Sequence, residues 1–166
     1  RDHCVTGVQT CALPILRIYQ KAGFEITRKL IGFEGKELKG ETCTKVQECD
    51  PRLAAHTLMQ FQPNLPWQVS GESLLPSSSR MQAYRLGNSL LFLQPLGETA
   101  IQIRGLYFAT QAEAEALLLH AFSLYPNQTF RLSPAFPEES VLPFLPQVGF
   151  TPLALTQYEM QKELPC

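Results

Sequence analysis

The stretch TAIQIRGLYFATQAEAEALLLHAFSL, residues 99–124, joins an apolar strand directly to a strong helix. Residues 99–109 are rich in Ile, Leu, Phe and Tyr, which favours a β-strand. Residues 110–124 consist mainly of good helix formers, and Thr110 followed by Glu113 is the signature of a capping box. A strand that leads into such a helix predicts a domain in which helices cover a sheet.

The segments on either side of this stretch extend the same pattern. Turn residues at 87–88 and 97–98 separate three apolar runs, so we expect three antiparallel strands over 81–86, 89–96 and 99–109. Before them we expect a strand over 44–48, a helix from Asp50-Pro51 to about Phe61, a short helix over 67–75 and a loop over 76–79. After them we expect a strand over 129–132, a helix over 138–148 interrupted by prolines, and a strand over 151–162.

Residues 16–43 carry a second, shorter pattern. Residues 16–22 have apolar side chains at helical spacing, and Gly23 suits the left-handed position after a helix. A strand over 24–33 and a polar linker over 36–41 follow. The predicted fold class is therefore α/β (α+β), with a mixed, largely antiparallel sheet and helices on both faces.

The first fifteen residues fit neither pattern. They show no helical or strand periodicity, and VTGVQTCALPI, residues 5–15, resembles the translation of one reading frame of a common sequencing adapter. We expect residues 1–15 to be a non-native segment without stable packing. In the natural protein, we expect other sequence to extend upstream of Leu16. The alternative is an ordinary flexible arm.

Composition excludes several classes of function. Of the 166 residues, 45% are hydrophobic and 17% are charged, and the net charge of −1 predicts neither a nucleic-acid partner nor a membrane partner. The five cysteines are an odd number without a C-x-x-C pair, which favours reduced thiols in a cytoplasmic protein. A metal site is not predicted, although Cys43, Cys49 and His56 stay open as a candidate set.

A short internal sequence repeat connects residues 16–43 with the rest of the chain. LRIYQKAGF at 16–24 and LPFLPQVGF at 142–150 share Leu, Gly and Phe and lie 126 positions apart. Two further segments, PWQVSGESL at 66–74 and QYEM at 157–160, occur in the same order as in a known family. Together with the order of the elements, they make residues 16–166 resemble the GNAT superfamily of acetyl-CoA-dependent N-acetyltransferases. More narrowly, the chain resembles the bacterial members of that superfamily that carry two such domains in tandem. The resemblance implies that residues 16–43 are the end of a first GNAT domain and residues 44–166 a second, GNAT-like domain.

The resemblance also implies where catalytic groups should lie. Family members hold the pyrophosphate of acetyl-CoA on a glycine-rich loop at a helix N-terminus. The corresponding segment here, 110–116, contains no glycine and no cation but carries Glu113 and Glu115, so no cofactor-binding residue is assigned. A Tyr four residues before Gly-Phe serves as general acid in many members; Tyr19 fits that position, and Leu145 replaces it in the second copy.

The expected function is therefore acetyl transfer from acetyl-CoA to an amine on a small molecule or peptide. Tyr19 would be catalytic, the missing first domain would supply the cofactor loop in cis, and this chain alone would not bind acetyl-CoA tightly. One alternative is a non-catalytic GNAT-like module that packs on an active domain or binds a partner; another is an unrelated α/β binding domain. Tyr19 could instead be only an amphipathic ring at a helix end, and Trp67 is expected to be a core anchor.

Overall fold

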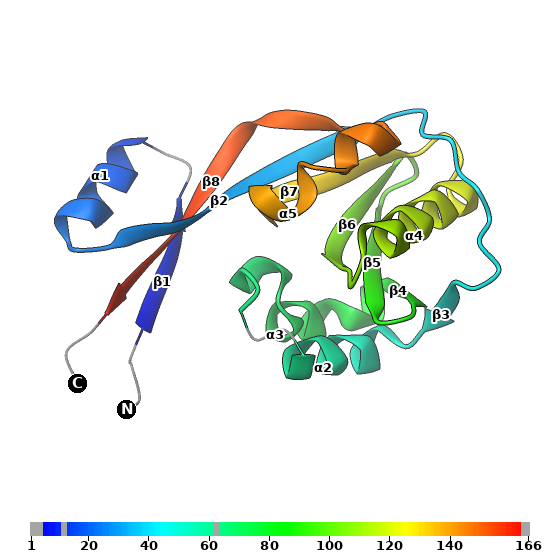
Figure 1. The fold of residues 1–166 in the computed structure, drawn as a ribbon, viewed down its shortest axis with the longest axis horizontal. Helices are drawn as coiled ribbons and strands as arrows, with labels where there is room; N and C mark the ends of the chain where they lie inside the picture. The colour runs from blue at the N-terminus through cyan, green and yellow to red at the C-terminus, as the bar shows by residue number, and fades with distance from the viewer. Residues whose placement is uncertain (1–4, 11–12, 62–63, 164–166) are drawn as a thin grey trace.

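The computed structural model describes residues 5–10, 13–61 and 64–163, which form one eight-stranded sheet with helices around it (Figure 1). The strands are β1 (Val5–Thr10), β2 (Glu25–Gly35), β3 (Gln47–Cys49), β4 (Gln82–Leu86), β5 (Ser89–Leu96), β6 (Ala100–Tyr107), β7 (Thr129–Pro137) and β8 (Thr151–Glu163). The α-helices are α1 (Leu13–Lys21), α2 (Pro51–Phe61), α3 (Gly71–Leu74), α4 (Gln111–Leu124) and α5 (Glu138–Val141). Three 3₁₀ helices complete the chain: η1 (Trp67–Val69), η2 (Leu75–Arg80) and η3 (Leu145–Val148).

The sheet order is β1-β8-β2-β7-β6-β5-β4-β3. Its neighbouring strands are antiparallel except for β6 and β7, which are parallel because α4 carries the chain back between them. The predicted fold class is thus confirmed, including helices on both faces.

Local sequence signals account for the central part of the fold. The β4-β5 and β5-β6 turns contain Gly87 and Gly97 with positive φ, as expected for tight hairpins. Thr110 caps α4 by accepting a hydrogen bond from the Glu113 N–H at 3.2 Å. The expected loop at 76–79 is instead part of η2. Strand β7 runs on to Pro137 because β2 pairs with it from Phe130 to Pro137.

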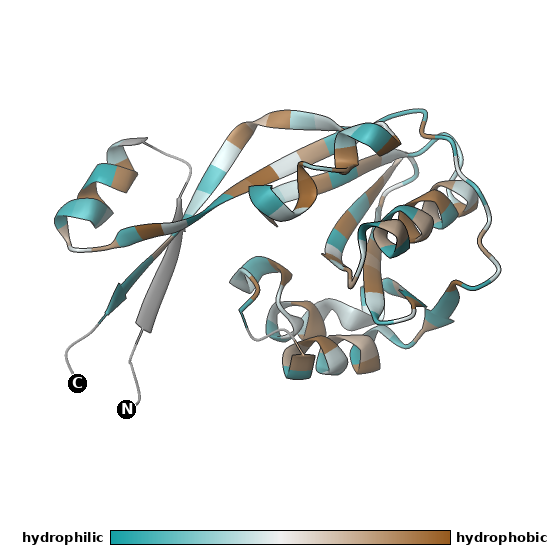
Figure 2. Ribbon diagram, in the orientation of Figure 1, coloured by the Kyte–Doolittle hydropathy of each residue, from teal (hydrophilic) through white to brown (hydrophobic). Residues whose placement is uncertain are grey.

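Two hydrophobic clusters fill the two faces of the sheet, and successive residues of β5 alternate between them. Leu91 and Leu93 pack with α4, whereas Leu90 and Phe92 pack with α2 and α3. Figure 2 shows hydrophobic residues along these strands and on α2 and α4. In the second half of β2, which lies between β8 and β7, Leu30 and Phe33 are fully buried and only Glu34 is half-buried.

The topology repeats around the β2-β8 pair. Each of these strands follows a helical segment that ends in a left-handed glycine, Gly23 with φ of 86° and Gly149 with φ of 99°, as the sequence repeat indicates. The antiparallel register joins Glu25 to Gln161 at one end and Glu34 to Thr151 at the other. On the outer sides, β7 flanks β2 and β1 flanks β8, so β1-α1-β2 repeats the arrangement of β7-α5-η3-β8.

Part of the segment 1–15, which we expect to lack stable packing, forms secondary structure. Backbone pairs join β1 to β8 from Val5↔Glu163 to Thr10↔Tyr158, and α1 begins at Leu13 rather than Leu16. Strand pairing uses backbone N–H and C=O groups, so the edge of β8 can accept a segment that has no apolar periodicity. Residues 1–4 and 11–12 lie outside the described residues.

We expect deletion of residues 1–12 to leave the fold intact. The side chains that the structure describes as buried in the core lie between Leu30 and Met160, so the deletion removes only an edge strand. The melting temperature should fall by no more than about 2–4 °C, corresponding to about 1 kcal/mol for a chain of this size. A larger fall in differential scanning calorimetry would show that β1 contributes to the stability of the sheet.

Candidate functional site

The parallel strands β6 and β7 separate at one end and leave a cavity between them. Their pairing covers only Ala100↔Thr129 to Ile103↔Leu132, after which β7 continues along β2. The cavity has a volume of about 530 Å³. It is lined by the ends of α2 and η1, by the end of β6 and by the turn from β7 into α5: Leu58, Leu65, Val69, Leu106, Tyr107, Phe108, Ala109, Phe136, Pro137, Glu139, Ser140 and Val141.

A β-bulge shapes the β6 wall just before the cavity. Phe92 pairs with Gly105 and the next residue, Leu93, pairs with Ile103, so Arg104 is the extra residue in β6. Its Nε atom is buried and has no hydrogen-bond partner. Bulges of this kind bend a strand and often lie beside active sites.

The N-terminus of α4, where the resemblance places the pyrophosphate loop, is occupied by a carboxylate of the chain. The fully buried Ser89 hydroxyl donates to Glu113 Oε2 at 2.5 Å and accepts the Ala109 N–H at 2.9 Å. A Cβ atom on Gly87 would lie 2.5 Å from Glu113 Oε1, so this carboxylate also lies against the β4-β5 turn. A negative charge near helix N–H groups stabilises the helix and disfavours a second anion there.

Glu115 is not part of this arrangement. Its carboxylate accepts a hydrogen bond from Gln111 Nε2 at 2.7 Å on the exposed side of α4. Of the two acidic residues singled out in the sequence, only Glu113 lies in the first turn of α4 and bonds to Ser89. The fit of this segment to a pyrophosphate is therefore poor.

The two candidate acid positions differ in surroundings. Leu145 is fully buried at the start of η3 and offers no proton. Tyr19 lies half-buried on α1, its ring in edge contact with Phe24 at a centroid distance of 5.3 Å. Figure 1 places α1 at the opposite end of the molecule from α4, so the structure does not bring Tyr19 to the cavity between β6 and β7.

Trp67 is not the core anchor that the sequence suggested. Its side chain is 59% exposed, whereas Pro66 and Val69 on either side of it are buried. The short η1 helix directs Val69 toward the cavity and leaves Trp67 on the surface.

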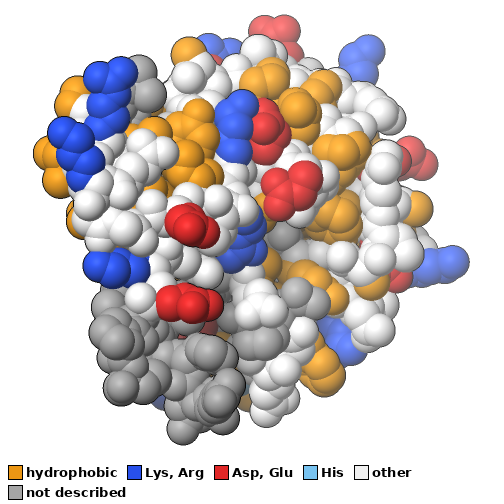
Figure 3. Space-filling view, turned by 60° about the vertical axis from the view of Figure 1, so that its left-hand side comes forward, with side chains coloured by type: hydrophobic (Ala, Val, Ile, Leu, Met, Phe, Trp, Pro, Cys, Tyr) orange, Lys and Arg blue, Asp and Glu red, His pale blue; other side chains and the backbone are white. Residues whose placement is uncertain are grey.

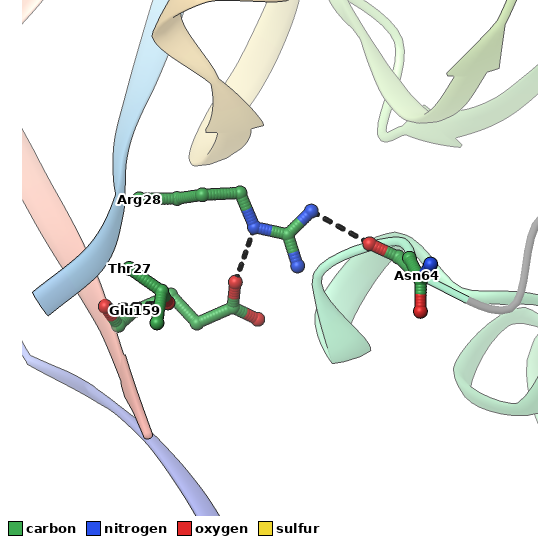
Figure 4. A network of polar contacts seen from close by, with 4 residues as sticks. All are labelled: Thr27, Arg28, Asn64 and Glu159. Atoms are coloured by element: carbon green, nitrogen blue, oxygen red, sulfur yellow. Dashed lines mark hydrogen bonds and ion pairs between the residues drawn. The ribbon is translucent and has the colours of Figure 1, made fainter. Parts of the chain in front are cut away.

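Strand β2 contributes contacts to this site that sequence reasoning missed (Figure 4). Arg28 Nε lies 2.5 Å from Glu159 Oε2 on β8, and Arg28 Nη1 donates to the carbonyl of Asn64 at 2.6 Å. Glu159 is only 7% exposed, so the guanidinium neutralises a buried carboxylate. The Asn64 contact holds the segment that places Leu65 in the cavity wall.

The neighbouring Lys29 anchors the other wall. Its Nζ atom donates to Glu138 Oε1 at 2.8 Å at the start of α5, and this hydrogen bond raises the pKa of Lys29. Because successive residues of a strand point to opposite faces, Arg28 and Lys29 reach opposite walls of the cavity. The two carboxylate partners, Glu159 and Glu138, lie 131 and 109 positions from Arg28 and Lys29, so no local sequence signal could have indicated them.

Other candidate groups do not form a site. Within residues 5–10, 13–61 and 64–163, no three His, Cys, Asp or Glu side chains come together to hold a metal ion. Cys43 and Cys49 are free thiols, and burial raises the pKa of Cys49. Cys4, Cys11 and Cys166 lie outside the described residues.

On the face shown in Figure 3, basic, acidic and hydrophobic side chains are mixed, and neither sign of charge dominates. No helix in the described part of the chain combines the length and the apolar character needed to cross a membrane.

No protein-family model and no curated protein matches the sequence. Solved structures do match: Eis1 from Mycobacterium abscessus over 96% of this chain and 47% of its own, with a TM-score of 0.67 and 14% identity. A GCN5-related N-acetyltransferase from Sphaerobacter thermophilus matches over 98% and 61%, with a TM-score of 0.60 and 13% identity. One from Kribbella flavida matches over 96% and 43%, with a TM-score of 0.60 and 14% identity.

These similarities show the fold. The chain has the fold of the GNAT N-acetyltransferases, with the separated parallel strands β6 and β7 at its centre. It spans between 43% and 61% of the length of these three solved chains.

Proposed function

We propose that this chain is the C-terminal part of an acetyl-CoA-dependent N-acetyltransferase with two GNAT-fold domains in tandem. The observation that carries the proposal is a repeat around the β2-β8 pair: a helical segment, a left-handed glycine and a strand follow one another in α1-Gly23-β2 and again in η3-Gly149-β8. In a complete protein of this kind, α1 and β2 would end a first domain, as α5, η3 and β8 end the second.

The exposed side of α1 supports an upstream domain in cis. Ile18 is 64% exposed, although it belongs to an amphipathic helix that should bury its apolar face. This chain covers 47% and 43% of two of the similar solved chains. Each of those chains therefore has room for another domain of comparable size. That domain would cover α1 and supply the strand that pairs with β8 in place of β1.

The proposed reaction transfers an acetyl group to the amine of a small molecule or peptide. The amine nitrogen attacks the thioester carbonyl and forms the new C–N bond, the C–S bond breaks, and the proton that the nitrogen loses passes to solvent, which in turn restores the proton of the general acid. The departing thiolate needs a proton, which we assign to the Tyr19 hydroxyl. Tyr19 precedes the Gly23-Phe24 pair that ends α1, at the position where the second copy has the fully buried Leu145.

The second domain acts as a non-catalytic module in this proposal. Glu113, bonded to Ser89, fills the helix end where a pyrophosphate would bind, and Leu145 cannot donate a proton. Its role would be to pack on the first domain, since Arg28 and Lys29 of β2 are bonded to Glu159 and Glu138 of the second domain. The same observations favour the second candidate function, a module that regulates an active domain or binds a partner.

We expect this chain alone to bind acetyl-CoA with a dissociation constant weaker than the low micromolar range, that is, with a binding free energy less favourable than about −8 kcal/mol. The physical reason is repulsion between the Glu113 carboxylate and the pyrophosphate. Isothermal titration calorimetry measures this directly. The full-length protein is the control and should bind acetyl-CoA through its first domain; tight binding by this chain would contradict the assignment of the second domain as non-catalytic.

A further inference from the structure

A second cavity lies on the α2 side of the turn between β4 and β5. Its volume is about 270 Å³, and it is lined by Thr57, Leu58, Phe61, Arg85, Asn88, Leu90 and Tyr107. It shares Leu58 and Tyr107 with the larger cavity but extends toward the Gly87-Asn88 turn. This volume is below the range of about 300–1,000 Å³ typical of pockets for drug-sized ligands, so it suits a smaller molecule.

Arg85 provides the charge of this second cavity. Its Nε atom donates to the Gly87 carbonyl at 2.8 Å, which holds the guanidinium beside the turn. None of the ion pairs found within the described ranges involves Arg85. Its terminal nitrogens can therefore form the paired hydrogen bonds that a carboxylate accepts from arginine, and the Asn88 amide adds a neutral donor on the same turn.

Three of the remaining lining residues, Leu58, Leu90 and Phe61, are apolar, and the other two are Thr57 and Tyr107. Leu58 and Leu90 are buried, and the Phe61 ring at the end of α2 is 69% exposed although it borders the cavity. A ligand with a flat or branched hydrocarbon body would cover the exposed ring and replace water over the two leucines.

The two sides of the β4-β5 turn carry opposite charges. Glu113 lies against Gly87 on the α4 side, whereas Arg85 lies on the α2 side. An anion is therefore repelled at the end of α4 and attracted at the second cavity. We propose that this cavity binds a small monocarboxylate with an apolar body, its carboxylate paired with Arg85 and its hydrocarbon part on Leu58, Leu90 and Phe61. The proposal does not depend on acetyl transfer by the full-length protein.

The test is a titration of this chain with 3-phenylpropionate, followed by chemical shifts in ¹H–¹⁵N NMR spectra. We expect saturable binding with a dissociation constant near or below about 1 mM, with shifts centred on residues 85–90. The neutral 3-phenylpropionamide has the same shape and should bind at least about fivefold more weakly, because a charge-assisted hydrogen bond is lost.

Two variants and one matched control assign the effect to Arg85. Arg85→Gln should weaken binding of the acid at least about fivefold, and Arg85→Lys should retain part of it because the charge remains without the forked geometry. Arg80→Gln removes another exposed arginine, at the end of η2 and outside the cavity lining, and should leave binding unchanged. The spectra of the free variants verify that they are folded.

The proposal is overturned by equal binding of acid and amide, by wild-type affinity in Arg85→Gln, or by an equal loss in Arg80→Gln. Absence of saturable shifts up to about 10 mM ligand, well above the expected dissociation constant, also overturns it.

Discussion

Replacing Tyr19 by Phe in the full-length, two-domain protein should lower the turnover of acetyl transfer by about 10²- to 10⁴-fold, the usual contribution of general acid catalysis. The substitution removes the hydroxyl that we assign to protonation of the departing thiolate. It keeps the ring, and with it the edge contact to Phe24 at 5.3 Å, so α1 should stay folded. Steady-state turnover with the natural amine acceptor, together with circular dichroism of the variant, measures both effects.

The matched control is Leu145→Met at the equivalent position of the second copy. Methionine has a similar volume to leucine, so the buried site should tolerate it at a cost below about 1.5 kcal/mol. Turnover should not change, because no proton donor is present there in the native chain. A Tyr19→Phe variant with wild-type turnover would contradict the catalytic assignment and leave Tyr19 as a packing residue at the end of α1.

Replacing Phe33 by Ala should destabilise this chain by about 3–5 kcal/mol, the range observed for loss of a buried aromatic ring. Phe33 is fully buried on β2, and its ring meets Phe150 edge to face at a centroid distance of 6.5 Å. Urea denaturation gives the change in the free energy of unfolding. Ile26→Ala on the exposed first half of the same strand is the control, and its cost should stay below about 1 kcal/mol.

Equal effects of these two substitutions would show that β2 does not depend on the core of residues 44–166. The expected difference between the two substitutions is a large fraction of the free energy of unfolding, which is about 5–15 kcal/mol for an ordinary domain. By sequence position β2 belongs to the proposed first domain, yet its second half is packed between β7 and β8. A cut at residue 43, where the sequence suggests a boundary, would remove a central strand.

Much of the fold could be predicted because its signals are local. The turns at Gly87 and Gly97 define the β4-β5-β6 meander, and the capping box at Thr110 defines the start of α4. The left-handed Gly23 and Gly149 end helical segments in both copies. Each of these features depends on residues within a few positions of one another, so the sequence alone contains the information.

The features that could not be predicted depend on partners far away in the chain. Arg28 and Glu159 form an ion pair across 131 positions, and the placement of β2 beside β8 follows from strand pairing rather than from composition. The exposure of Trp67 could not be predicted, because the orientation of η1, which turns Val69 toward the cavity, decides which of its side chains are buried. In the candidate site, the sequence indicates that Glu113 is unsuited to a phosphate, but the hydrogen bond between Glu113 and Ser89 is evident only in the three-dimensional structure.

The position of β2 between β7 and β8 has a consequence for biosynthesis. The ribosome completes Gly35 and must then add 116 residues before Thr151, the first residue of β8, exists (151 − 35 = 116). At about 5–20 residues per second this interval lasts roughly 6–23 s, during which the apolar segment from Leu30 to Phe33 has neither of its neighbouring strands for most of the time. The nascent chain therefore carries a hydrophobic strand without its neighbouring strands over this interval, and we expect synthesis rate and chaperone capacity to govern the yield of folded protein.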